Sequence, residues 1–141
     1  MKKSPRSTLA VAALTFIALG IVTAAFGPAL PELALQTGSS IEAVGAIFTT
    51  LFLGALTAQA VSGFLIDRWG ARTVLLVSSV ILAFGTMGVA FSPSLPLYLV
   101  CGVLMGIGHG AVDVATNVLI AAVYEKRSLT VLNLLHFCCG T

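Results

Sequence analysis

Three polar residues stand out in an apolar stretch late in the chain: His109, Asp113 and Asn117. They are spaced four residues apart, so on a helix they would lie along one face over about 12 Å. A carboxyl group with an imidazole and an amide beside it can take up and release a proton and can contact a polar solute. These three residues are therefore our candidates for a substrate and proton pathway.

Other kinds of chemistry fit this trio poorly. One histidine and one carboxylate are too few ligands for a metal site. A hydrolase would need a nucleophile beside the histidine and aspartate, and none is present there. We therefore expect no metal site and no enzyme. One alternative stays open, a structural cluster in which His109, Asp113 and Asn117 bond one another and only fix helix packing.

The elements that carry these residues must lie in a membrane. Hydrophobic residues make up 58% of the chain and charged residues only 9%, whereas a soluble domain carries about 25% charged residues. The net charge is +2 and the basic residues are scattered, so no nucleic-acid partner is expected. The composition predicts an all-α integral membrane protein with the lipid bilayer as its surroundings.

Four apolar segments are long enough to cross a bilayer, which takes about 20 helical residues. A fifth segment is too short to cross, so we expect the chain to be the N-terminal part of a longer protein. Pro28 and Pro31 should weaken the end of the first helix. The predicted segments are a cytoplasmic N-terminus (1–7), four spans (8–30, 41–66, 73–91 and 95–123), two cytoplasmic loops (67–72 and 124–127) and a truncated fifth helix (128–141).

The basic residues predict the orientation. All 7 fall on one side of the predicted spans, and the positive-inside rule makes that side cytoplasmic. We therefore expect a multi-pass protein of the cell membrane whose N-terminus is cytoplasmic. The residues are Lys2, Lys3, Arg6, Arg68, Arg72, Lys126 and Arg127.

Within the fourth span, Asp113 lies near the middle of the bilayer. A carboxylate there costs about 2.5–3.5 kcal/mol on insertion scales and usually faces a bundle interior or a water-filled cavity. Gly102, Gly106 and Gly110 repeat every four residues along the same span. Small residues at that spacing let two helix backbones approach closely in lipid, so we predict a helix-packing role for them.

The loop between the second and third spans carries a long sequence motif. Its glycine at position 70 permits a sharp reversal, and its arginines suit the anionic cytoplasmic surface. Asp67 ends a helix, where its charge opposes the helix dipole, so it should have a partner elsewhere. The motif residues are Gly63, Leu65, Asp67, Arg68, Gly70, Arg72 and Leu75, while Ala71 departs from the pattern at one basic position.

This motif resembles the signature of the major facilitator superfamily, in the slot between helices two and three where that family has it. The resemblance implies a twelve-helix transporter fold of which this chain is the N-terminal part. It also implies that Asp67 helps to latch the cytoplasmic side against a helix of the C-terminal half. We expect that half to be the partner of this chain.

The order of Gly106, Gly108, Asp113 and Asn117, followed by residues 132–137, resembles the fucose-permease-like branch of sugar–proton symporters. Asp113 matches a glutamate that is linked to proton coupling in those relatives. The chain departs from them at Gly102, where the family commonly has an arginine, and in having no acidic residue in the first span.

The resemblance implies proton-coupled symport of a small polar, sugar-like solute, driven by a proton gradient and without a cofactor. Two alternatives remain. One is a proton-coupled exporter of drugs or metabolites from the same superfamily. The other is a membrane sensor or scaffold that keeps the fold without transporting.

Overall fold

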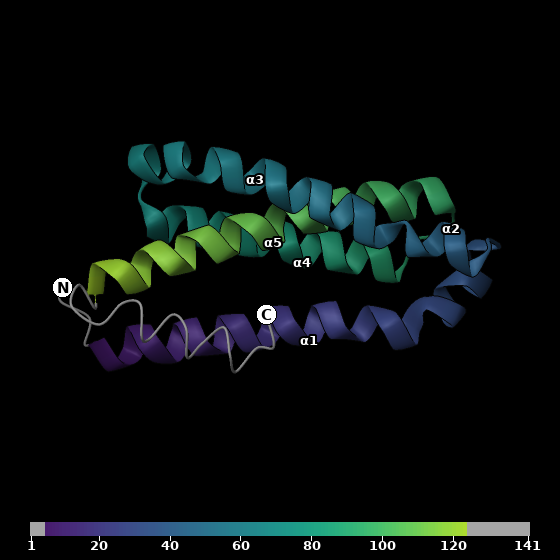
Figure 1. Ribbon diagram of the computed structural model, residues 1–141, viewed down its shortest axis with the longest axis horizontal. Coiled ribbons are helices and arrows are strands. Elements are labelled where there is room, and N and C mark those ends of the chain that lie inside the picture. The colour runs from purple at the N-terminus through teal and green to yellow at the C-terminus, as the bar shows by residue number, and fades with distance from the viewer. Residues whose placement is uncertain (1–4, 124–141) are drawn as a thin grey trace.

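The computed structural model describes residues 5–123, and these form helices joined by short links, with no strand among them. The predicted fifth helix (128–141) and the loop before it (124–127) lie outside the described residues, as do residues 1–4. Figure 1 shows the long helices lying side by side along one direction. The helices are α1 (Pro5–Thr37), α2 (Ile41–Gly45), α3 (Ile47–Trp69), α4 (Ala71–Ala90) and α5 (Leu95–Val123).

The helices supply four candidate membrane spans, so the predicted all-α membrane fold is confirmed. Large apolar side chains are exposed on the outside of the bundle, including Leu14, Phe52, Phe84 and Val100. Such a surface would be unfavourable in water and suits contact with lipid chains. The spans are Leu9–Thr37, Ile41–Trp69, Ala71–Ala90 and Leu95–Val123.

The first span differs from the prediction at its end, because α1 continues through Pro28 and Pro31 to Thr37. Proline removes one helical hydrogen bond, but contacts with neighbouring helices can offset that loss in a membrane protein. Here the side-chain amide nitrogen of Gln36 donates to the carbonyl oxygens of Ala90 and Ser92, at 3.2 and 3.0 Å. These bonds to a distant part of the chain hold the turns beyond the prolines in place.

The second span is built from two helices, α2 and α3. The hydroxyl of Ser40 accepts a hydrogen bond from the backbone N–H of Ala43 at 3.2 Å and so caps α2. Ala46 follows α2 and precedes α3, which then runs unbroken to Trp69. The second span therefore contains a break, between α2 and α3, that the sequence did not indicate.

Helix α5 is the centre of the bundle. It packs along both α3 and α4 and makes fewer contacts with α1, whereas α3 and α4 contact each other sparsely. Tyr98 and Met105 of α5 are fully buried in a core with Phe26 of α1 and Ile47 of α3. Any residue on α5 is consequently placed with respect to three other helices.

Candidate functional site

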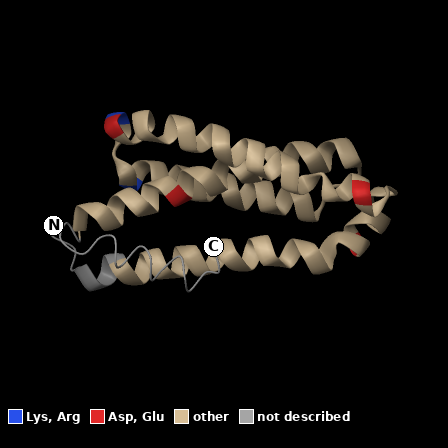
Figure 2. Ribbon diagram, in the orientation of Figure 1, with Lys and Arg blue, Asp and Glu red and all other residues tan. Residues whose placement is uncertain are grey.

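The polar trio predicted from the sequence lies on α5 and is half-buried. The side-chain amide nitrogen of Asn117 donates a hydrogen bond to Oδ1 of Asp113, at 3.2 Å. Figure 2 shows acidic residues in red at the ends of the bundle and at one position along α5. The aspartate is therefore set apart from the other charged groups, with an amide as its hydrogen-bond donor.

Two polar atoms beside Asp113 are buried and have no hydrogen-bond partner within residues 5–123. They are Nδ1 of His109 and Oδ1 of Asn117. A buried polar atom without a partner costs about 1–3 kcal/mol, so such atoms mark places where a ligand or water can bind favourably. The trio is thus not a closed hydrogen-bonded cluster, because only the bond between Asp113 and Asn117 is formed.

A third buried polar atom of this kind belongs to Tyr98, which the sequence analysis did not single out. Its hydroxyl has no hydrogen-bond partner within residues 5–123, although the side chain is 0% exposed. Tyr98 precedes His109 by about three helical turns, so the two residues share a face of α5. That spacing is visible in the sequence, but the burial of the hydroxyl is not.

The glycines of α5 bring its backbone against α3. A side-chain carbon at Gly106 would meet the carbonyl oxygen of Leu51, and one at Gly110 would lie 2.8 Å from Cα of Ala55. At Gly102 such a carbon would meet the side chains of Ile47 and Thr50. No larger residue fits at Gly106 or Gly110 without moving a helix, whereas at Gly102 the contacting atoms belong to side chains that can shift.

The polar trio lies on the same side of α5 as these glycines. Each member follows one of them by seven residues, which is just under two helical turns. Nearer the end of α5, Ile120 packs on Ala12 and Phe16 of α1. The face that carries Asp113 therefore begins where α5 touches α3 and ends where α5 touches α1.

The signature loop lies at one end of the bundle, between α3 and α4. Gly70 has φ 82° and ψ 145°, and its N–H donates to the carbonyl oxygen of Ile66 at 2.8 Å. Gly63 lies on α3 with open space where a side chain would be. Gly70 thus takes a conformation that L-residues rarely adopt, and it allows α4 to start immediately after α3.

The charged residues of the loop, Asp67, Arg68 and Arg72, are all exposed. None of them forms an ion pair or a side-chain hydrogen bond with another residue in the range 9–123. Asp67 is therefore not paired with Arg72 of the same loop. A partner outside the described residues, as the family resemblance implies, stays a prediction.

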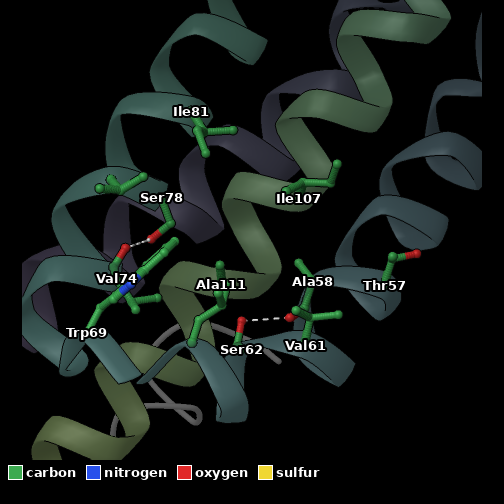
Figure 3. Close-up of a pocket in the computed structure, with 12 residues that line it drawn as sticks. Thr57, Ala58, Val61, Ser62, Trp69, Val74, Ser78, Ile81, Ile107 and Ala111 are labelled. Atoms are coloured by element: carbon green, nitrogen blue, oxygen red, sulfur yellow. Dashed lines mark hydrogen bonds between the residues drawn. The ribbon is translucent and has the colours of Figure 1, made fainter. Parts of the chain in front are cut away.

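The same range contains no group of three or more His, Cys, Asp or Glu residues that could hold a metal ion. It does contain a cavity that the sequence analysis missed. This groove of about 250 Å³ lies between α3 and α4, with Ile107 and Ala111 of α5 among its lining residues (Figure 3). Its lining comes from three helices, so no local pattern in the sequence marks it.

Comparisons with known proteins agree with this architecture. A family model described as Major Facilitator Superfamily matches residues 12–138. Sodium-dependent glucose transporter 1 from Homo sapiens is 29% identical over 123 residues, which cover 87% of this chain and 24% of that protein. An uncharacterized MFS-type transporter from Mycobacterium tuberculosis is 31% identical over 118 residues, covering 80% of this chain and 17% of that protein.

A third relative is solute carrier family 2, facilitated glucose transporter member 12, from Homo sapiens. It is 33% identical over 87 residues, which cover 60% of this chain and 14% of that protein. No solved structure matches the chain significantly. The chain spans a quarter or less of the length of these three relatives, all of which are named as transporters rather than as enzymes. The family match covers most of the chain, and the chain therefore belongs to the major facilitator superfamily.

Proposed function

We propose that this chain is part of a proton-coupled symporter for a small polar, sugar-like solute. Asp113 takes up and releases the coupling proton, and His109 and Asn117 contact the solute. One observation carries the proposal. A carboxyl group in an apolar span is bonded by one neighbour and lies beside two buried polar atoms that have no partner within residues 5–123.

The coupling role follows from the cost of charge in a membrane. An ionised carboxylate at the bilayer centre costs several kcal/mol unless it faces polar groups or water, and binding a proton removes that charge. Such a group binds a proton on one side of the membrane and releases it on the other when the site is exposed alternately. Asp113 is the only acidic residue within α5.

The solute contacts follow from the unpartnered atoms. A hydroxyl group both donates and accepts hydrogen bonds, so a polyhydroxylated solute can satisfy Nδ1 of His109 and Oδ1 of Asn117 together. The printed names of two relatives include glucose transport, which supports a sugar-like solute here. The solute site would be completed by the C-terminal half of a longer protein, across the bilayer midplane.

The test is uptake by vesicles that contain the native protein carrying this chain. Asp113→Asn should abolish accumulation driven by a pH gradient, while exchange of labelled for unlabelled solute continues. Ser79→Ala is a matched control, because Ser79 is exposed and its hydroxyl bonds only within its own helix. Unchanged pH-driven accumulation in Asp113→Asn would refute the coupling role.

A second candidate is coupling to sodium instead of protons. It is favoured by the relatives from Homo sapiens and Rattus norvegicus that are named sodium-dependent glucose transporter 1. The same vesicles decide between the two ions, because a sodium gradient at equal pH would drive accumulation only in the second case. Movement of solute out of the cytoplasm, coupled to proton entry, would instead indicate an exporter. If no solute moved at all, the protein would be a sensor or scaffold.

A further inference from the structure

Helix α3 carries one amide side chain in the middle of its span, that of Gln59. Gln59 is exposed, and its amide forms no hydrogen bond within residues 9–123. An amide in hydrocarbon without a hydrogen-bond partner is unfavourable, so polar groups at this depth usually face other polar groups or water. Thr57 and Ser62 on the same helix differ, because their hydroxyls donate to carbonyl oxygens of α3 itself. Gln59 therefore needs a partner that α3 does not supply.

Gln59 lies on the side of α3 that faces α1. On that side the ring of Phe48 packs edge-on against Phe26 of α1, with ring centroids 6.3 Å apart. Gln59 follows Phe48 by eleven residues, which is about three full turns, so both side chains project from the same side of α3. Thr57 comes two residues earlier and projects from nearly the opposite side, where it lines the groove next to α4 (Figure 3). Gln59 is thus turned away from that groove and toward the α1 side of the bundle.

Gln59 is also level with the polar trio of α5. A side-chain carbon at Gly110 would meet the backbone of Ala55, and the preceding glycine of α5 makes the same kind of contact one turn earlier on both helices. The two helices therefore run in the same direction and in step at this contact. Gln59 follows Ala55 by one turn, which brings it level with the turn of α5 that carries Asp113 and Asn117.

The polar side chains of the spans consequently gather in one zone. The trio occupies the face of α5 between its contact with α3 and its contact with α1, and Gln59 projects toward the same side from α3. Away from the ends of the four described spans, only four side chains carry an amide, an imidazole or a charge. These are Gln59, His109, Asp113 and Asn117. Two different helices therefore contribute to a single polar zone.

We propose that Gln59 is the fourth member of the solute site and binds a hydroxyl group that the trio does not contact. This inference rests on the proposed function, in which a sugar-like solute lies beside Asp113. An amide both donates and accepts hydrogen bonds, so it can bind a hydroxyl group in either sense. Because Gln59 and Asn117 lie on different helices, their amides contact different parts of the solute. The site then favours a solute with hydroxyl groups at separated positions, as in a sugar ring.

Paired cysteines test whether Gln59 and the trio face each other. The native protein carrying this chain, with its own cysteines replaced by serine, receives Gln59→Cys and Asn117→Cys. A short bismaleimide should join this pair, as detected by mass spectrometry of the linked peptides. Thr57→Cys with Asn117→Cys is the matched control and should react several-fold less, because Thr57 is also exposed but projects from the other side of α3. Equal reaction of the two pairs, or none in the first, would overturn the proposal.

Uptake of D-glucose into vesicles tests the contact with the solute. Gln59→Leu should raise the KM about two- to tenfold, because one hydrogen bond between uncharged groups is lost. One monodeoxy analogue of glucose should have a higher KM than glucose in the unmodified protein but the same KM as glucose in Gln59→Leu, since it lacks the hydroxyl that Gln59 binds. Thr57→Val is the control and should leave the KM unchanged, because the hydroxyl of Thr57 bonds only within α3.

The results that contradict this inference differ from those that contradict the proposed function. An unchanged KM in Gln59→Leu would remove Gln59 from the site and leave the proposed function standing. A KM raised by the same factor for glucose and for all its monodeoxy analogues would make the effect of Gln59 structural. No uptake of D-glucose by the unmodified protein would overturn the sugar-like solute and, with it, the contact of that solute with Gln59.

Discussion

The side-chain amide of Asn117 donates a hydrogen bond to Oδ1 of Asp113 across one turn of α5, at 3.2 Å. The opposite atom of the same amide, Oδ1, is buried without a partner within residues 5–123. One side chain thus orients the carboxyl group with its nitrogen and leaves its oxygen for a ligand. The carboxyl group that binds the proton and the solute would then both form hydrogen bonds with the amide of Asn117.

Asn117→Ala should lower the apparent affinity for the solute about two- to tenfold. A hydrogen bond between uncharged groups contributes about 0.5–1.5 kcal/mol, and 1.4 kcal/mol is a factor of ten. The measurement is the KM of solute uptake, with Ser79→Ala as the control. A KM equal to that of the unmodified protein would remove Asn117 from the solute site.

Gly106→Ala should destabilise the helix bundle by about 1–3 kcal/mol, as overpacking usually does. The added carbon would meet the backbone of Leu51, which no side-chain rotation can relieve. Gly27→Ala is the matched control, since a helical position with nothing within 4 Å of the new carbon should accept alanine. Thermal unfolding in detergent measures the stability of both variants. Equal melting temperatures for Gly106→Ala and Gly27→Ala would contradict the close packing of α3 and α5.

Gly70→Ala should cost about 1–3 kcal/mol for a different reason. Its φ of 82° with ψ of 145° is close to a region that only glycine occupies readily. Gly63→Ala lies seven residues earlier in the same signature, on a helix with open space around it, and should be neutral. If thermal unfolding showed the same stability for both variants, backbone conformation would not explain the glycine at position 70.

Tyr98→Phe should leave stability unchanged or raise it slightly. The hydroxyl is buried without a partner within residues 5–123, so its removal discards an unfavourable group and keeps the ring in the core. Tyr98→Ala should cost about 3–5 kcal/mol, because it leaves a large cavity. Loss of stability in Tyr98→Phe would mean that the hydroxyl has a partner beyond the described residues.

The orientation predicted from the basic residues can be tested with single cysteines. A cysteine at Arg72 should be protected from a membrane-impermeant thiol reagent in intact cells. Cysteines at Ser39 and Ser94, in the two links without Lys or Arg, should react. The reverse pattern would place the N-terminus outside.

The presence of four long apolar helices followed from the sequence, because a span needs only about 20 consecutive apolar residues. The end of α1 did not follow, since Gln36 bonds to carbonyl groups 54 and 56 residues further along the chain. Rules that use only neighbouring residues take the prolines into account, but they do not include hydrogen-bond acceptors so far along the chain.

The residues of the candidate site could be predicted from the sequence, but the contacts among them could not. Spacing by four places His109, Asp113 and Asn117 on one face. It does not say which pairs bond, and only Asp113 and Asn117 do. Glycine spacing likewise predicted a close helix contact without naming the partner, which is α3 for Gly106 and Gly110 and Leu82 of α4 for Gly108. Such partners depend on helix positions in space, which periodicity alone does not contain.

The bonds from Gln36 also have a consequence for the order in which the protein is made. When α1 leaves the ribosome, the carbonyl groups of Ala90 and Ser92 have not yet been synthesised, so the amide of Gln36 has neither acceptor. The last turns of α1 can take their final position only after α4 has entered the membrane. Helix α1 is thus synthesised before α4 and obtains these contacts after it.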